Sequence, residues 1–125
     1  MKKIFPILLA VIIFSSCSVF KSVDYKLAQS KTNFDISKLD KNGLIKNRGV
    51  SLAYEFCIPN NESALADIKR IDETISIYIS SVGRIGCSKT EVLCIGQTYN
   101  TDYKKTLIAI SKLSYVEKIN ESLFE

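Results

Sequence analysis

The sequence of 125 residues contains no histidine. Histidine is the base of Ser-His-Asp triads and of Cys-His nucleophile pairs, and it is a common zinc ligand. Its absence excludes all three kinds of site. The chain also lacks a Walker phosphate loop and a dinucleotide-binding fingerprint. Since no complete set of nucleophile, base and orienting group can be assembled, the sequence predicts a protein that is not an enzyme and needs no cofactor.

Long apolar runs are absent as well, because the run from Ile4 to Phe14 is too short to cross a bilayer. Spanning roughly 30 Å of hydrocarbon takes about 20 apolar residues. The run follows two lysines and is followed by Ser15 and Ser16. A positively charged start, a short apolar stretch and small residues are the layout of a cleaved secretory signal.

Cys17 ends this segment, and the layout of residues 1–17 resembles the lipobox of bacterial lipoproteins, with Phe14 where that family usually has leucine. The resemblance implies that signal peptidase II removes residues 1–16 and that acyl chains such as palmitate are attached to Cys17. Several acyl chains would anchor the protein to a membrane almost permanently. Ser18 stands where aspartate favours inner-membrane retention in some bacteria, so the outer membrane of the cell envelope is favoured. The alternative is an ordinary secretory peptide with Cys17 as a plain thiol.

The charge balance argues against nucleic acid as a partner. Removing residues 1–16 takes away two of the 17 basic residues and none of the 13 acidic ones, which leaves a formal net charge of +2. Lysines alternate with acidic residues along most of the chain, whereas a nucleic-acid binder shows a concentrated basic face.

The mature chain is long enough for one hydrophobic core and too short for two. Residues 17–47 are rich in Ser, Lys, Asp and Asn and show no sustained apolar period from Ser22 to Asn42. We expect the lipidated Cys17 and a flexible tether over residues 17–47, followed by one domain over residues 48–125. If the residues from Ser18 to Asn42 behave as a flexible coil, they hold the domain about 25–30 Å from the bilayer.

From Val50 onward, apolar residues recur with clear periods in the order strand, helix, strand, strand, helix, strand. The strands are expected at about 52–58, 75–80, 91–98 and 115–124. The first helix is expected to begin at Asn60 or Asn61, and the second at Asn100 or Thr101, because these side chains can cap a helix.

The two helices follow strands one and three, and right-handed connections place both of them on the same face of the sheet. The expected fold is α+β, a ferredoxin-like βαββαβ two-layer sandwich with an antiparallel sheet. In that arrangement strand three lies between strands one and two, and strand four flanks strand one.

Lipidation of Cys17 would leave Cys57, Cys87 and Cys94 in an oxidising compartment. Cys57 lies at the end of the first strand, where either Cys87 or Cys94 could reach it. We prefer the pair Cys57 and Cys87, because a flexible loop meets the requirement of about 5.5 Å between Cα atoms more readily than a fixed ladder position does. Cys94 would then be a free thiol in the core. The alternative is three thiols without a bond.

A metal or redox site at these cysteines is not expected, because the short paired C-x-x-C spacing is missing. One acidic pair is a further candidate. Glu55 and Glu91 could meet on the open face of the sheet, either as an acid–base pair or as solvated surface acids.

The loop over residues 81–89 is the best local candidate for recognition. Its two glycines allow backbone N–H groups to converge, and Arg84 and Lys89 add donors that suit a carboxylate or phosphate of an anion or partner. A long hairpin connection stiffened by a Cys87 bond explains the same residues without any ligand.

Three functions remain. The first is a non-catalytic interaction or structural module of a membrane-anchored envelope lipoprotein with an unknown envelope partner. The second is binding of peptidoglycan, since the strand-helix-strand plan is similar in topology to sporulation-related repeat domains, although no glycan-binding motif can be aligned. The third is a small enzyme similar to acylphosphatases, whose first strand-helix turn presents an arginine, whereas Pro59-Asn60-Asn61-Glu62 offers none.

Overall fold

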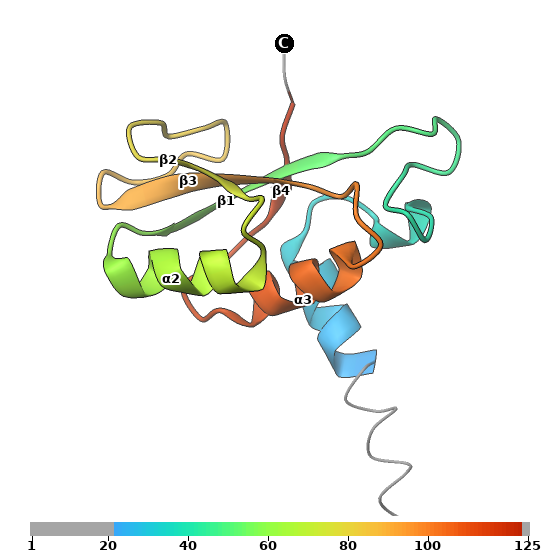
Figure 1. Cartoon of the computed structure of the whole chain (residues 1–125), viewed down its shortest axis with the longest axis horizontal. Helices are drawn as coiled ribbons and strands as arrows, with labels where there is room; N and C mark the ends of the chain where they lie inside the picture. The colour runs from blue at the N-terminus through green and yellow to red at the C-terminus, as the bar shows by residue number, and fades with distance from the viewer. Residues whose placement is uncertain (1–21, 124–125) are drawn as a thin grey trace, which may run out of the picture.

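The computed structural model describes residues 22–123, so the predicted signal peptide and Cys17 lie outside the described residues. This part of the chain forms a mixed α+β structure with a four-stranded antiparallel sheet (Figure 1), which confirms the predicted class. The strands are β1 (Ala53–Pro59), β2 (Ser76–Tyr78), β3 (Glu91–Gln97) and β4 (Asn120–Glu121). The helices are α2 (Glu62–Ile71), α3 (Tyr103–Lys112), a short 3-10 helix η1 (Ile36–Lys38) and a helical segment over residues 22–31.

The strands are arranged in the order β2-β3-β1-β4. The longest ladder joins β1 to β3 and runs from Ala53 opposite Gln97 to Pro59 opposite Glu91. Helices α2 and α3 lie on the same side of the sheet (Figure 1). Alternation along β1 turns large apolar side chains toward these helices, and Phe56 and Ile58 are completely buried there.

Helix α2 begins where the sequence predicted, because the Asn61 side chain accepts a hydrogen bond from the backbone N–H of Ala64 at 2.8 Å. Its apolar face carries Ile68, which is fully buried in the core. Helix α3 begins later than predicted, at Tyr103. Asp102 occupies the N-cap position of α3 without a side-chain cap bond. Within residues 22–123, no helix has the length and apolar character needed to span a membrane.

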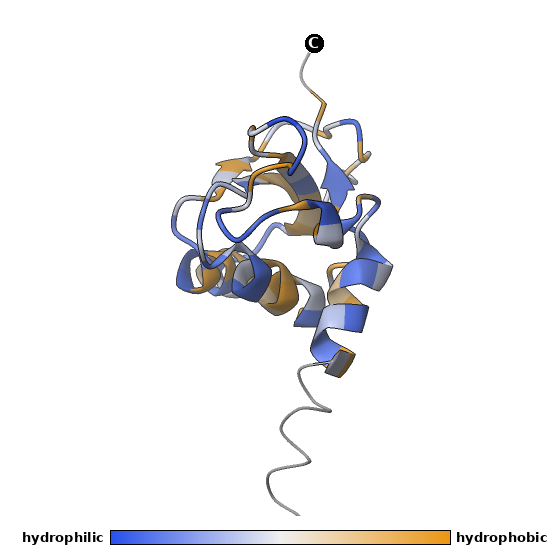
Figure 2. Ribbon diagram, turned by 90° about the vertical axis from the view of Figure 1, so that its right-hand side faces the viewer, coloured by the Kyte–Doolittle hydropathy of each residue, from blue (hydrophilic) through white to orange (hydrophobic). Residues whose placement is uncertain are grey.

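The hydrophobic residues are concentrated in the strands and in the helices beneath them, whereas most of the surrounding loops are hydrophilic (Figure 2). The main core draws residues from every part of the described chain. Its buried members include Ala28, Ile36, Leu39, Leu52, Tyr54, Phe56, Ile58, Ala64, Ile68, Ile75, Val92, Cys94, Tyr103, Leu107, Ile110, Val116 and Ile119.

The prediction of a flexible tether is wrong for its described part, residues 22–47. Ala28 and Ile36 are each 1% exposed and Leu39 is 4% exposed, so this segment supplies part of the core. The helix over residues 22–31 lies below and beside α3 (Figure 1). The buried residues of the segment 22–47 are irregularly spaced, so the sequence shows no apolar period there. They are buried because they pack into a core that distant elements complete.

The last strand is also shorter than predicted, since only Asn120 and Glu121 pair with β1 as a strand. The preceding residue, Ile119, bonds to the N-terminal segment instead. Its N–H donates to the Lys31 carbonyl at 2.7 Å, and its carbonyl accepts from the Asn33 N–H at 3.1 Å. The segment that the sequence predicts to be a tether is therefore hydrogen-bonded to the edge of β4 that faces away from β1.

Candidate functional site

Residues 79–90 join β2 to β3 and fold back over the face of the sheet that lies opposite the helices (Figure 1). Here Ile85, Cys87 and Leu93 form a second buried cluster, with Cys57 and Ile95 packed against it. From the sequence, no element was expected to cover this face of the sheet. The structure shows that the loop covers part of it and has an apolar underside of its own.

A disulfide between Cys57 and Cys87 attaches this loop to β1, as preferred from the sequence, with 5.5 Å between the Cα atoms. Cys94 is a free cysteine and is completely buried on the helical side of the sheet. Burial raises the pKa of the Cys94 thiol to about 12. The Cys94 thiol therefore stays protonated at neutral pH and behaves as a small apolar core residue.

Glu55 holds the same loop from below. Its side chain is buried, and its Oε1 atom accepts a hydrogen bond from the backbone N–H of Ile85 at 2.7 Å. Its Oε2 atom accepts from the Ser122 hydroxyl at 3.3 Å. Gly83 lies close by with a positive φ of 65°, and a Cβ atom there would lie 2.8 Å from a methyl group of Leu93. The loop thus approaches the sheet as closely as glycine allows.

Glu55 and Glu91, which the sequence allowed to meet on this face, do not form a pair. Glu55 lies opposite Ile95 in the ladder, whereas Glu91 lies opposite Pro59 at the end of β1. The Glu91 carboxylate instead accepts from the backbone N–H of Ser88 at 2.8 Å. Each carboxylate therefore anchors a different part of the loop. The sequence carried one signal for the role of Glu55, because this acidic residue lies within an otherwise apolar strand.

A hollow of about 290 Å³ lies beside the disulfide, at the end of the β1–β3 ladder where Pro59 meets Glu91. Charged and apolar groups from β1, the loop, the start of β3 and the chain after α3 meet around it. It is lined by Cys57, Ile85, Gly86, Glu91, Tyr115, Glu117 and Lys118. Sequence reasoning assigned no role at a site to the last three residues, because it placed them in a long final strand.

The two basic residues singled out from the sequence are on this loop but not in the hollow. Arg84 precedes the lining residue Ile85 and is exposed, and Lys89 is exposed two positions before Glu91. The structure therefore brings Cys57 and Cys87 together and leaves Arg84 and Lys89 on the outer surface of the loop.

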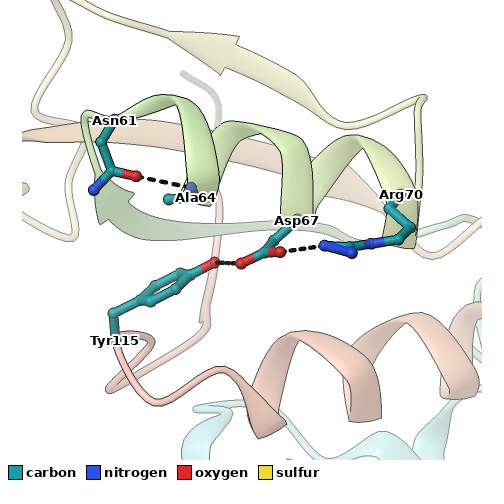
Figure 3. Close-up of polar contacts among 5 residues, drawn as sticks. All are labelled: Asn61, Ala64, Asp67, Arg70 and Tyr115. Atoms are coloured by element: carbon teal, nitrogen blue, oxygen red, sulfur yellow. Dashed lines mark hydrogen bonds and ion pairs between the residues drawn. The ribbon is translucent and has the colours of Figure 1, made fainter.

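Tyr115 connects the hollow to α2 (Figure 3). Its hydroxyl donates a hydrogen bond to Asp67 Oδ2 at 2.8 Å, and the other carboxylate oxygen of Asp67 is paired with Arg70. The bond from Tyr115, followed by the bond from Arg70, lowers the pKa of Asp67. Partial burial, followed by the bond to Asp67, raises the pKa of Tyr115 to about 12. The segment after α3 is thereby fixed against α2.

The raised pKa of Tyr115 predicts a loss of stability in alkali. In the unfolded chain its hydroxyl ionises near pH 10, while the folded protein keeps the proton until about pH 12. The stabilisation is fully present below pH 10 and is lost as the pH rises toward 12. Urea unfolding at pH 8, 10 and 11 should show this decrease, and Tyr115→Phe should reduce it.

Tyr78→Phe is the matched control for this measurement, because Tyr78 is an exposed tyrosine on β2. Burial also raises the pKa of Tyr54, so part of the alkaline decrease should persist in the Tyr115→Phe protein. Equal pH profiles for wild type and Tyr115→Phe would contradict the prediction.

Among residues 22–123, no group of three or more cysteine, aspartate and glutamate side chains could hold a metal ion. Comparison of the sequence with protein-family models, with curated proteins and with solved structures found no match. The site must therefore be interpreted from its own chemistry.

Proposed function

We propose that this protein is a lipid-anchored, non-catalytic module of the bacterial cell envelope that docks a partner protein. The observation that carries the proposal is the disulfide between Cys57 and Cys87. Structural disulfides persist in oxidising compartments and are rare in the cytosol. This agrees with the secretory signal in residues 1–16 and with Cys17 at the lipobox position, from which the protein would be anchored to the outer membrane in preference to the inner one.

The fold is proposed to be the ferredoxin-like two-layer sandwich. Its support is the order β2-β3-β1-β4, the antiparallel pairing of all three neighbouring pairs, and the position of α2 and α3 on one side of the sheet. The helix over residues 22–31 and η1 are additions to that plan.

The hollow beside the disulfide is the proposed docking surface for the partner. Its loop wall is fixed by a covalent bond and by hydrogen bonds to Glu55 and Glu91. A surface that is rigid before binding loses less conformational entropy when a partner docks. Glu117 and Lys118 are exposed at this hollow and offer both signs of charge to a protein surface.

The folded part of the chain would lie close to the membrane. The described structure is already helical at residue 22, which is five positions after Cys17. Five residues span at most about 17 Å when fully extended. With Cys17 lipidated, the module would therefore contact partners at the membrane surface, nearer than the 25–30 Å that a flexible coil over residues 18–42 would give.

Replacement of Cys17 by alanine tests the anchor. The full chain is expressed in a bacterium that has two membranes and is supplied with labelled palmitate. We expect the wild type to incorporate the label and to sediment with outer membranes, and Cys17→Ala to accumulate as an unprocessed, unlabelled precursor. Ser18→Ala is the matched control and should still be labelled. If wild type and Cys17→Ala are cleaved alike and neither is labelled, residues 1–16 are an ordinary secretory peptide and the anchor is disproved.

Binding of peptidoglycan is the second candidate function. The observation that favours it is a neutral hollow with an exposed tyrosine at the other end of the β1–β3 ladder. Its lining carries no charged side chain, whereas charged side chains line the hollow beside the disulfide.

A further inference from the structure

A second hollow, of about 270 Å³, lies where β3 ends and α3 is about to begin. It is at the opposite end of the β1–β3 ladder from the disulfide. All of its lining residues are uncharged. They are Asn42, Leu44, Tyr99, Asn100 and Thr101.

The two walls of this hollow come from segments more than 50 residues apart and are joined through Thr98. The Thr98 side chain is completely buried. Its hydroxyl donates to the Gly43 carbonyl at 2.7 Å and accepts from the backbone N–H of Leu52 at 2.9 Å. Gly43 has a φ of 79°, and a Cβ atom there would lie 1.5 Å from the Thr98 carbonyl oxygen. Only glycine permits this contact, which fixes the distance between the walls.

Each wall is also held internally. On one side, Asp40 Oδ1 accepts from the backbone N–H groups of Asn42 at 2.8 Å and Leu44 at 3.0 Å. On the other side, Asn100 Oδ1 accepts from the backbone N–H of Asp102 at 2.9 Å. The hollow is therefore formed before any ligand arrives, and this lowers the entropic cost of binding.

Tyr99 projects into solvent at this site. Its side chain is 71% exposed, the highest value among the large hydrophobic residues of the described chain. The neighbouring Asn42 amide and Thr101 hydroxyl make no side-chain hydrogen bond within residues 22–123. An open aromatic face with uncharged hydrogen-bonding groups beside it is thus available to a ligand.

We propose that this hollow binds a neutral segment of a polysaccharide chain. The apolar C–H face of a sugar ring can stack on Tyr99, while the amide and hydroxyl groups exchange hydrogen bonds with the sugar hydroxyls. The lining offers no charge to balance a phosphate or a carboxylate. The inference rests on the second candidate function only for the identity of the natural polymer. Binding of a neutral sugar chain is argued from the lining residues of the hollow.

Co-sedimentation with insoluble polymers tests the proposal. The full chain is purified in detergent and mixed with chitin, which is a neutral polymer of N-acetylglucosamine, or with purified peptidoglycan sacculi, each with and without soluble chitin oligosaccharides as competitor. We expect binding to chitin and to sacculi, and displacement from both by the soluble oligosaccharides. Tyr99→Ala should weaken binding by about tenfold, because a tyrosine that a bound ligand covers typically contributes this much.

Tyr78→Ala is the matched control, since it removes another exposed tyrosine from a different part of the surface, β2. It should bind like the wild type, and both variants should unfold at the wild-type urea concentration. If the wild type binds none of the polymers, or if Tyr99→Ala binds as well as the wild type, the hollow is not a glycan site. Binding to sacculi that soluble chitin oligosaccharides fail to displace would identify a ligand other than the sugar chain and would also overturn the inference.

The two proposals fail separately in this experiment. Binding to sacculi that is unaffected by Tyr99→Ala would support the peptidoglycan function and overturn this site. Binding to chitin that depends on Tyr99, without binding to sacculi, would support the site and remove peptidoglycan as its natural polymer.

Discussion

Ile36→Ala should lower the free energy of unfolding by about 2–4 kcal/mol, although residue 36 lies in a segment with the composition of a linker. The Ile36 side chain is 1% exposed and belongs to the main core. Truncation removes buried methyl and methylene groups and leaves a void that the surrounding helices and strands fill only in part. Urea unfolding followed by circular dichroism measures the change.

Val23→Ala is the matched control in the same segment, because Val23 is 56% exposed. It should change the free energy of unfolding by less than about 0.5 kcal/mol. A flexible tether would make the two variants equivalent, so equal stabilities would contradict the structural role of this segment.

A chain that begins at residue 48 should fail to fold for the same reason. It would lack Ala28, Ile36 and Leu39 from the core and would leave the backbone groups of Ile119 without the partners at Lys31 and Asn33. Loss of both buried apolar surface and buried hydrogen bonds exceeds the net stability that a domain of this size usually has. A cooperative unfolding transition in the truncated chain would show that the segment is dispensable.

Removal of the disulfide is the second large effect. The double variant Cys57→Ala and Cys87→Ala should lose about 3–4 kcal/mol, because the bond closes a loop with a sequence separation of 30 and thereby restricts the unfolded chain. The same bond holds the loop that forms one wall of the hollow beside the disulfide. Urea unfolding with and without reductant measures the loss.

Cys94→Ala is the control for this experiment, since Cys94 is buried but not bonded. It should cost roughly 1 kcal/mol for the small cavity that it leaves. It should also remain sensitive to reductant, as the wild type is, whereas the double variant should not respond to reductant at all. A wild-type protein whose stability does not change on reduction would contradict the stabilising role of the bond.

The sequence by itself determined the elements whose signals are local. Alternation along residues 52–58 gave the buried face of β1, and Asn61 marked the start of α2 because an asparagine oxygen can cap the free N–H groups of the first turn. The position of Cys57 at the end of the first strand, with Cys87 in the loop before the third strand, was sufficient to prefer their pairing. These features depend on residues close in sequence or on a simple strand order.

Only the tertiary structure decided the features that depend on distant surfaces meeting. In the sequence Glu55 has the pattern of a surface acid, and only the fold shows that the loop at Ile85 covers it. Tyr99 gains neighbours at Asn42 only because Gly43 fits against the end of β3. Ile36 lies in a polar segment without a period, and it is buried because it joins a core whose other members come from distant elements, among them α3 and Ile119. Such burial is set by shape across long sequence separations, which no local pattern encodes.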